Sequence, residues 1–307
     1  MIATHREGGR YSGSTTIALE QLDRWNHLAP LDQNSGSTLA HDGRALVYQV
    51  TQDLRPLWRL ESAEELEQCY VELLEAHFHA YNRARILHGD ISASNAMARR
   101  DAKGKVFGLL SDWGLSCLAD AHNLGTSSTS RHRTGTAPFM AMDLQRAASK
   151  YSVAADHRYC HDLESFFWLL LWAVLHFDLK RKRHRNCTHE DWIGDCRECA
   201  ARFKRDFMTY GGTWDRVVDD VLDMWQPILK RWVKPLARMI YTARERSTHW
   251  NDDNFRVFDD DVYAKELTFE AFMQRIKQTP RDRTHEEKGR YNGERHMAGQ
   301  RRVFSES

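Results

Sequence analysis

The stretches HGDISASN at residues 88–95 and SDWG at residues 111–114 decide the fold of this chain. The first stretch places an aspartate and an asparagine five positions apart, and the second adds another aspartate before a glycine. Between them, Ala96–Arg99 and Val106–Leu110 have the composition of strands and flank a turn-rich tetrapeptide at 101–104. This pattern predicts a β-hairpin, which brings the loop before its first strand close to the loop after its second.

The side chains in these two loops are the ones that phosphoryl transfer requires. The reaction needs a carboxylate that orients and deprotonates the attacking hydroxyl, and oxygen ligands that hold Mg²⁺ against the phosphates. Asp90 and Asn95 place such a base and a metal ligand on one loop, and Asp112 adds a second metal ligand across the hairpin. Gly114 lets the chain turn sharply after that aspartate. Each pattern alone is common in surface loops, so the prediction rests on their order along the chain.

The segments around these loops are mostly helical in pattern. Ser62 and Glu65 form a capping-box pattern before apolar residues at three- and four-residue steps, which predicts a helix that delivers the chain to residue 88. A polar stretch at 115–142, ending in TGTAPFMA, is long enough to be a functional loop. Further helices are expected at Asp162–Phe177, Asp195–Tyr210, Trp214–Ile240 (broken or kinked at Pro227 and Pro235) and Thr268–Lys277.

Both ends of the chain differ from this helical part in composition. Residues 1–44 are rich in Gly, Ser, Thr and Asn, with little periodicity, and are expected to be poorly structured. Ala45–Val50 has the composition of a strand. Residues 278–307 are charged and almost free of aliphatic side chains, which predicts a disordered tail.

Composition excludes few classes of function. The formal net charge of +1 on 307 residues gives no reason to expect specific nucleic-acid binding. The first 15 residues lack the apolar core of a secretory signal, so an intracellular location, cytoplasmic or nuclear, is expected. The longest apolar run, Phe166–Leu175, is too short to span a bilayer, so no membrane partner is predicted.

The six cysteines are expected to be free thiols in a reducing compartment. Cys187, Cys196 and Cys199, with histidines nearby, raise the alternative of a zinc site. No second C-x-x-C accompanies them, so helix-packing roles are favoured for Cys196 and Cys199, one turn apart on an expected helix.

The motifs HGDISASN, SDWGL, RTGTAPFMA and HDLESFFWLLLW resemble those of the fungal-type protein kinases, a divergent branch of the protein kinases, over residues 45–277. The resemblance implies an α+β, protein-kinase-like fold with a mostly helical catalytic C-lobe at 62–277. It also implies a hinge strand and linker at 45–61 and a truncated or degenerate β-rich N-lobe at 1–44. ATP and Mg²⁺ are the implied cofactors, and a protein is the implied phosphate acceptor.

The same resemblance assigns roles to individual residues. Asp90 matches the catalytic base, and Asn95 and Asp112 match the residues that bind the magnesium of Mg-ATP. Asp162 matches the buried aspartate that ties down the backbone of the catalytic loop. His88 and Gly114 match residues that support the loops structurally. Residues 115–142 match the activation segment, which includes Thr134, Gly135 and Thr136.

Three positions depart from the common kinase pattern. Gly89 stands where most protein kinases have an arginine that pairs with a phosphorylated activation segment, so ordering by phosphate through this position is not expected. Ser92 replaces a lysine of many serine/threonine kinases, which leaves the class of hydroxyl acceptor open. Asp143 replaces the glutamate of the A-P-E motif, with either Arg244 or Arg246 as its partner.

The front of the sequence departs further. A kinase uses an N-lobe lysine to hold the α- and β-phosphates, and no lysine precedes Lys103 here. The glycines at 8, 9 and 13 do not form a G-x-G-x-x-G loop. A lost charge-assisted phosphate contact costs about 1.5–3 kcal/mol. Weak or absent phosphoryl transfer is therefore expected from the chain as given.

Two other functions remain open. The lysine-free front favours a pseudokinase or scaffold that binds partners without catalysis. The H-G-D order at 88–90 also resembles small-molecule phosphotransferases of the aminoglycoside- or choline-kinase type. Those enzymes lack an activation segment of the kind that ends here in TGTAPFMA, which favours a protein acceptor.

Overall fold

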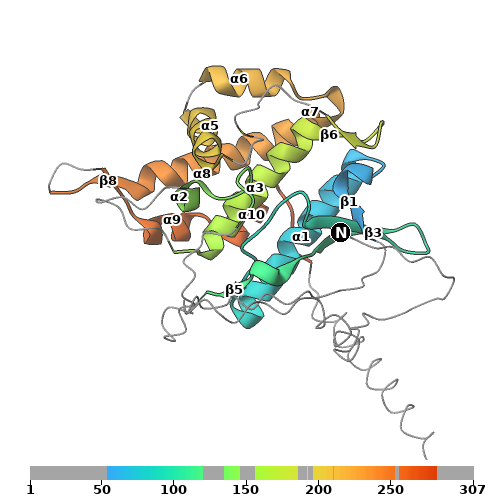
Figure 1. The fold of residues 1–307 in the computed structure, drawn as a ribbon, viewed down its shortest axis with the longest axis horizontal. Helices are drawn as coiled ribbons and strands as arrows, with labels where there is room; N and C mark the ends of the chain where they lie inside the picture. Colours follow the sequence, from blue (N-terminus) through green and yellow to red (C-terminus); the bar gives the residue numbers. More distant parts are fainter. Residues whose placement is uncertain are drawn as a thin grey trace, which may run out of the picture. The chain divides into compact units, whose positions relative to one another are not determined.

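The computed structural model describes residues 54–119, 135–145, 156–185, 192, 196–209, 211–252 and 256–281. The expected strand Ala45–Val50, the segment 1–44 and the tail after residue 281 lie outside these residues, as does Thr134. The described part is an α+β fold dominated by helices, with a small three-stranded sheet (Figure 1).

The expected hairpin forms this sheet. Strand β3 (Ala96–Arg100) pairs antiparallel with β4 (Val106–Leu110), with the first residue of each strand opposite the last of the other. Asp101 closes the turn, because its Oδ1 accepts the N–H groups of Lys103 and Lys105, both at 2.9 Å. A two-residue strand that the sequence pattern did not predict, β1 (Arg55–Pro56), adds to the outer side of β3.

Helix α1 (Ala63–Ala84) lies against this hairpin. Ser62 caps it by accepting the N–H of Glu65 at 3.3 Å, while the carboxylate of Glu65 accepts the N–H of Glu61 at 2.8 Å. The helix approaches β4 so closely that a Cβ on Gly108 would lie 2.3 Å from the carbonyl oxygen of Cys69. A glycine is therefore required here, and this contact fixes the hairpin on the helix.

The core centres on α3 (Tyr159–His176), of which nearly every residue is buried. Its apolar sequence faces other helices on all sides, which explains why it shows no polar face. Tyr70 of α1 donates its hydroxyl hydrogen to the carbonyl oxygen of Phe166 at 2.8 Å, so α1 and α3 are joined by a buried hydrogen bond as well as by packing.

The expected long helix at Trp214–Ile240 is divided into several pieces. Pro227 and Pro235 lie in the first turns of α7 and α8, where the missing N–H of proline costs little. Besides α3, the helical elements beyond the hairpin are η3 (Trp113–Leu115), α2 (Met142–Gln145), α5 (Arg197–Thr209), α6 (Gly211–Asp219), η4 (Asp223–Trp225), α7 (Gln226–Ile228), the π-helical η5 (Leu229–Val233), α8 (Lys234–Ser247), α9 (Asp260–Glu266) and α10 (Phe269–Arg275).

Three short antiparallel pairs complete the fold, and none was predicted. They are β2 (Ile86–Leu87) with β5 (Cys117–Leu118), β6 (Phe177–Asp178) with β7 (Arg183–His184), and β8 (Thr248–Trp250) with β9 (Arg256–Phe258). Strands of two or three residues are too short to produce an alternating pattern in the sequence.

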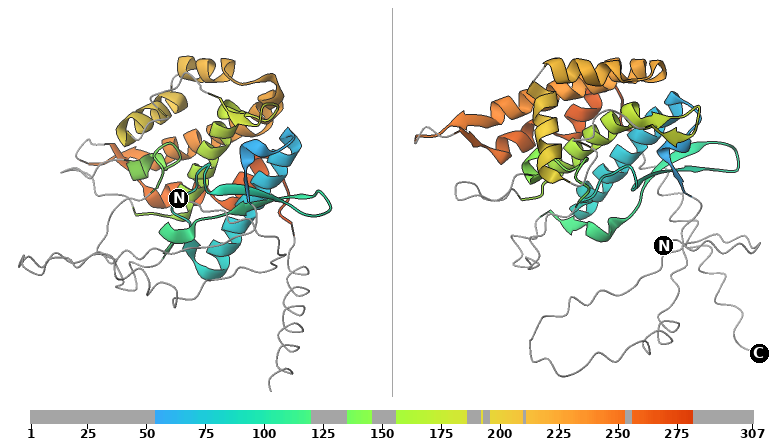
Figure 2. Two further views of the ribbon diagram at one scale, coloured as in Figure 1. Left: turned by 45° about the vertical axis from the view of Figure 1, so that its right-hand side comes forward. Right: turned by 45° about the horizontal axis from the view of Figure 1, so that its top comes forward.

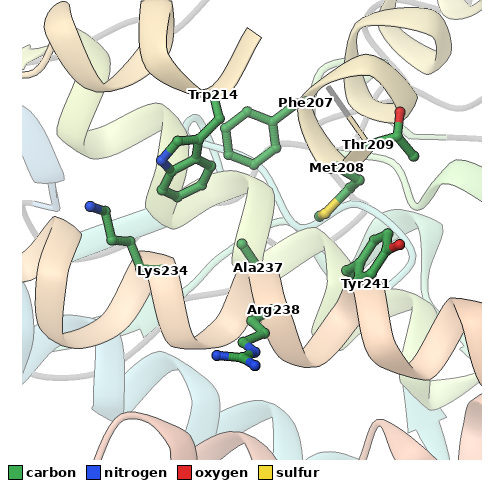
Figure 3. A pocket seen from close by; sticks show the side chains of 8 residues that line it. All are labelled: Phe207, Met208, Thr209, Trp214, Lys234, Ala237, Arg238 and Tyr241. Atoms are coloured by element: carbon green, nitrogen blue, oxygen red, sulfur yellow. The ribbon is translucent and has the colours of Figure 1, made fainter. Parts of the chain in front are cut away.

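The helices α5, α6 and α8 gather on one side of the fold (Figure 2) and line an open pocket of about 340 Å³ (Figure 3). The residues of α8 that line this pocket are spaced three or four positions apart or adjacent, as on one face of a helix: Lys234, Ala237, Arg238 and Tyr241. Among the helices that the structure describes, none is both long and apolar enough to cross a membrane.

The cysteines differ from the prediction of free thiols. Cys196 and Cys199 form a disulfide at the start of α5. Cys69, Cys117 and Cys160 are free, and Cys187 lies outside the described residues. No group of three or more metal-binding His, Cys, Asp or Glu side chains occurs in the described ranges, which leaves the zinc alternative without support there.

Candidate active site

The loop that carries Asp90 follows directly from α1. The helix ends at Ala84, and Arg85 takes a left-handed conformation (φ 55°) that turns the chain into strand β2. Strand β2 pairs with β5, so the residues before Asp90 lie beside those that follow Asp112. Together with the β3–β4 hairpin, this pairing brings the two predicted catalytic segments to one place from both sides.

Asp162 lies at the base of this loop, buried at the first turn of α3. Its Oδ2 accepts the backbone N–H of His88 at 2.8 Å and lies 2.7 Å from Nε2 of His77. Its Oδ1 lies 2.7 Å from Nε2 of His157. One carboxylate therefore joins the loop, helix α1 and the segment that leads into α3.

The electrostatics of this cluster follow from burial and charge. Burial alone raises the pKa of Asp162, but His157 and His77 outweigh it and hold the pKa well below its ordinary value. Burial opposes the protonation of His157, and the adjacent Asp162 carboxylate overcomes this and raises the pKa of His157. Burial lowers the pKa of His88 against the attraction of Asp162. A neutral His88 agrees with its contacts, since Nδ1 accepts the N–H of Asp90 at 3.3 Å and Nε2 lies 3.1 Å from the Ser111 carbonyl oxygen.

Asp90 is held from two sides. Its Oδ1 accepts both the N–H and the hydroxyl of Thr136, at 2.9 and 2.8 Å. Its Oδ2 accepts the amide of Asn95 at 2.9 Å, and the same amide donates to the Asp90 carbonyl oxygen at 2.8 Å. An ionised carboxylate oxygen accepts about two hydrogen bonds. Oδ1 is thus filled, and Oδ2 keeps one position for a hydroxyl group.

Asp112 lies two residues beyond the end of β4. Ser111 donates its N–H and its hydroxyl to the carbonyl oxygen of Asn95, at 2.9 and 3.0 Å. Asp112 itself has a left-handed backbone (φ 58°, ψ 68°), and its Oδ1 accepts the N–H of Gly114 at 3.3 Å. The carboxylate of Asp112 is exposed, whereas Asn95 is buried.

The side chains at this place fit a magnesium ion by their chemistry. Asn95 uses its amide nitrogen on Asp90, and its amide oxygen, which has Ser94 Oγ 3.5 Å away, would be the atom available to a cation. The exposed carboxylate of Asp112 is a second oxygen donor. Mg²⁺ prefers oxygen ligands and commonly takes one or two from protein, with phosphate and water supplying the rest. Asn95 and Asp112 would supply a number of protein oxygens within this range.

Gly89 has a structural cause for replacing the common arginine. Its φ of 82° lies in the left-handed region, and an added Cβ would lie 2.8 Å from the carbonyl oxygen of Leu115. A larger residue here would move the segment after Asp112 away from the loop. Gly135 also has a positive φ, 133°, immediately before Thr136 turns towards Asp90.

The partner of Asp143 is Arg244. The two form a two-pronged ion pair at 2.7 and 3.0 Å, while Arg246 pairs with Glu266 on the surface. The Asp143 side chain is 2 % exposed and that of Arg244 is 20 % exposed. Burial opposes the charge of Arg244, but Asp143 outweighs it and raises the pKa of the guanidinium.

An Arg244→Met variant is expected to lose about 2–3 kcal/mol of unfolding free energy, because a buried carboxylate is left without its donor. Arg246→Met is the matched control, since an exposed pair contributes at most about 1 kcal/mol. Denaturant unfolding measures both. Equal losses in the two variants would show that the Asp143 pair is no stronger than a surface contact.

Several residues of this site carried no recognisable sequence signal. His77 and His157 lie outside the motifs. His77 is close to Asp162 because α1 packs against the start of α3, and His157 is close because the segment before α3 returns to its first turn. Glu164 lies in the motif HDLESFFWLLLW, but the resemblance assigned no role to it. It is buried and accepts the N–H of Met142 at 2.9 Å and the hydroxyl of Tyr263 at 2.7 Å.

Comparison with known proteins agrees with this geometry. The family model described as fungal protein kinase matches residues 9–174, more than half of the chain. The match includes the segments that carry Asp90 and Asp112 and most of α3, and it begins well before the described residues. No curated protein matches the chain. The chain belongs to the fungal protein kinase family.

Proposed function

We propose that the chain is a protein kinase that transfers the γ-phosphate of Mg-ATP to a hydroxyl group of a protein. The observation that carries the proposal is the arrangement of Asp90, whose Oδ1 is filled by Thr136 and whose Oδ2 is oriented by Asn95. A carboxylate held in this way has one position left for an acceptor hydroxyl, which is what a base in phosphoryl transfer needs.

In the proposed reaction, Asp90 Oδ2 accepts the hydrogen bond of the acceptor hydroxyl and takes its proton as the oxygen attacks the γ-phosphorus. The bond from that phosphorus to the β–γ bridging oxygen breaks, and ADP leaves. The Asn95 amide oxygen and the Asp112 carboxylate would hold a magnesium ion, which would neutralise charge on the phosphates. His88 and Asp162 keep the loop in place.

A second function, a scaffold without catalysis, is supported by the absence of any lysine before Lys103 in this sequence. A kinase site that holds the α- and β-phosphates without a lysine binds nucleotide about ten- to a hundredfold more weakly, because a charged hydrogen bond contributes about 1.5–3 kcal/mol. The kinase proposal therefore predicts slow transfer rather than none.

The test is incorporation of label from ATP carrying a labelled γ-phosphate, into the chain itself or into a mixed protein acceptor, with Mg²⁺ and with a chelator. Slow incorporation that requires Mg²⁺ is the expected result. The absence of incorporation at millimolar Mg-ATP, from a folded chain, would contradict the kinase proposal and leave the scaffold.

A further inference from the structure

Side chains from the helical part of the chain bind three carbonyl groups of residues 136–141, a segment here termed the acceptor loop. Lys204 Nζ donates to the carbonyl oxygens of Ala137 at 3.1 Å and Met140 at 2.5 Å. Gln145 also donates to Ala137 O, at 2.6 Å, and the indole N–H of Trp192 donates to the carbonyl oxygen of Pro138 at 2.8 Å. The loop is thus fixed through its backbone carbonyl groups, and the side chains of Phe139 and Met140 are buried as well.

Lys204 stands out because it is fully buried. Among the described residues, no carboxylate lies within ion-pair distance of its Nζ, and the nearest ring face is that of Trp168, 5.1 Å away. Burying an ammonium group without a charged partner is costly. An apolar side chain would fill this core position at lower cost, so the two carbonyl contacts explain the lysine.

The helix that carries Lys204 is itself firmly attached. Phe203 stacks on Trp192, with ring centroids 5.0 Å apart and planes 8° apart. Near the C-terminal end of α5, Phe207 packs against Trp214 of α6, with centroids 5.0 Å apart, in the wall of the pocket shown in Figure 3. The amine of Lys204 therefore projects from a fixed support towards the acceptor loop.

The other end of the acceptor loop reaches the catalytic base. The Thr136 carbonyl oxygen accepts the N–H groups of Phe139 and Met140 at 2.9 and 3.1 Å, which makes a compact turn. The N–H and hydroxyl of Thr136 bind Asp90. A displacement of the Met140 carbonyl group would therefore reach the Asp90 carboxylate through the turn at residues 136–140.

We propose that Lys204 is a positioning residue for phosphoryl transfer, which fixes the acceptor loop through Ala137 and Met140 and, through Thr136, the orientation of Asp90 and the seat of the protein acceptor. This inference rests on the proposed function for its catalytic part, but the attachment of the loop is independent of activity.

The protonation of Lys204 does not interrupt this attachment. Burial lowers the pKa of its amine to about 7, against the attraction of Glu164 on α3. A neutral amine still has two N–H donors, one for each carbonyl. Both hydrogen bonds therefore persist on either side of neutral pH.

The test compares Lys204→Met, which keeps the length of the side chain but removes its donors, with Arg202→Met, an exposed position on the same helix. Hydrogen exchange at the amides of Phe139 and Met140 is measured first. Exchange at these two amides is expected to become roughly tenfold faster in Lys204→Met, and to stay unchanged in Arg202→Met, because a loop that loses its anchors opens locally. Amides in the middle of α3 are expected to exchange at the wild-type rate.

A kinetic readout separates positioning from stability. In Lys204→Met, the KM for the protein acceptor is expected to rise and kcat to fall, while the KM for ATP stays constant. Lys204→Gln, which keeps one donor group, is expected to be intermediate in both measurements and serves if the methionine variant does not fold.

Two results would overturn the proposal. One is acceptor-loop exchange at the wild-type rate in a folded Lys204 variant. The other is acceleration by the same factor in the loop and in α3, which shows a general loss of stability. If the wild-type chain transfers no phosphate, the proposed function fails, yet the exchange experiment still decides whether Lys204 holds the loop.

Discussion

An Asp162→Ala variant is expected to lose about 3–5 kcal/mol of its free energy of unfolding, the usual cost of removing one partner from a buried charged cluster. The carboxylate of Asp162 receives the His88 N–H and contacts His77 and His157. Without it, the buried His77 ring and the His88 N–H lose their acceptor in a region that excludes water. Urea unfolding followed by tryptophan fluorescence measures the loss.

The control for this variant is Asp261→Ala. Asp261 accepts a hydrogen bond from Arg158, but its side chain is 73 % exposed. Water replaces an exposed contact, so little change in stability is expected. If Asp162→Ala unfolds at the same denaturant concentration as Asp261→Ala, the Asp162 cluster does not organise the loop.

The stability difference between the wild-type chain and Asp162→Asn is expected to depend on pH. The pKa of Asp162 is depressed in the folded state, so its contribution is fully present above the ordinary value of 3.8 and is lost as the pH falls. The pKa of His157 is raised, so its contribution is fully present below 6.5 and is lost as the pH rises through the folded-state value. The stability difference between the wild-type chain and Asp162→Asn is therefore largest between pH 3.8 and 6.5, and it decreases at lower and at higher pH. A difference that is constant with pH would contradict the charge assignment.

Asp90→Asn is expected to lower the rate of phosphoryl transfer by about 10²–10⁴-fold, the usual contribution of a positioned general base. The amide is nearly the same size as the carboxylate, and its oxygen can still accept from Thr136. The other position becomes an NH₂ group, which repels the amide of Asn95 and cannot accept the proton of the hydroxyl. Steady-state transfer of labelled phosphate measures the effect.

Asp215→Asn on α6 provides the control, because this aspartate is exposed and lies outside both motif segments. Its transfer rate is expected to equal that of the wild-type chain. Circular dichroism and the unfolding midpoint establish whether Asp90→Asn stays folded. A folded Asp90→Asn variant with wild-type activity would remove Asp90 from the reaction.

The parts of the fold that the sequence predicts are those that depend on local pattern. The hairpin at 96–110 follows from two short apolar runs around a turn, and α1 follows from a cap and a helical repeat. The long pattern after Trp214 was expected as a helix broken or kinked at Pro227 and Pro235. The structure divides it after Asp219, because residues 220–222 leave the helical conformation before the helix re-forms near Pro227.

The contacts that hold the candidate site depend on tertiary packing, and no local pattern reports them. Whether Arg244 or Arg246 pairs with Asp143 depends on how α8 is oriented relative to α2, and the sequence pattern does not give this orientation. Lys204 was equally hidden, because a lysine in an amphipathic helix is expected to face water. It is buried here because carbonyl groups of the acceptor loop lie beneath α5.

The central claim is that Asn95 and Asp112 hold the magnesium of Mg-ATP, and a thermal or chemical unfolding titration with nucleotide tests it most directly. At a hundred times its dissociation constant, Mg-ATP is expected to add about 2.7 kcal/mol to the stability of the wild-type chain. ATP with a chelator, or Mg-ATP with an Asp112→Asn variant, is expected to add much less. Equal stabilisation in all three mixtures, or none with the wild-type chain at millimolar Mg-ATP, would contradict the claim.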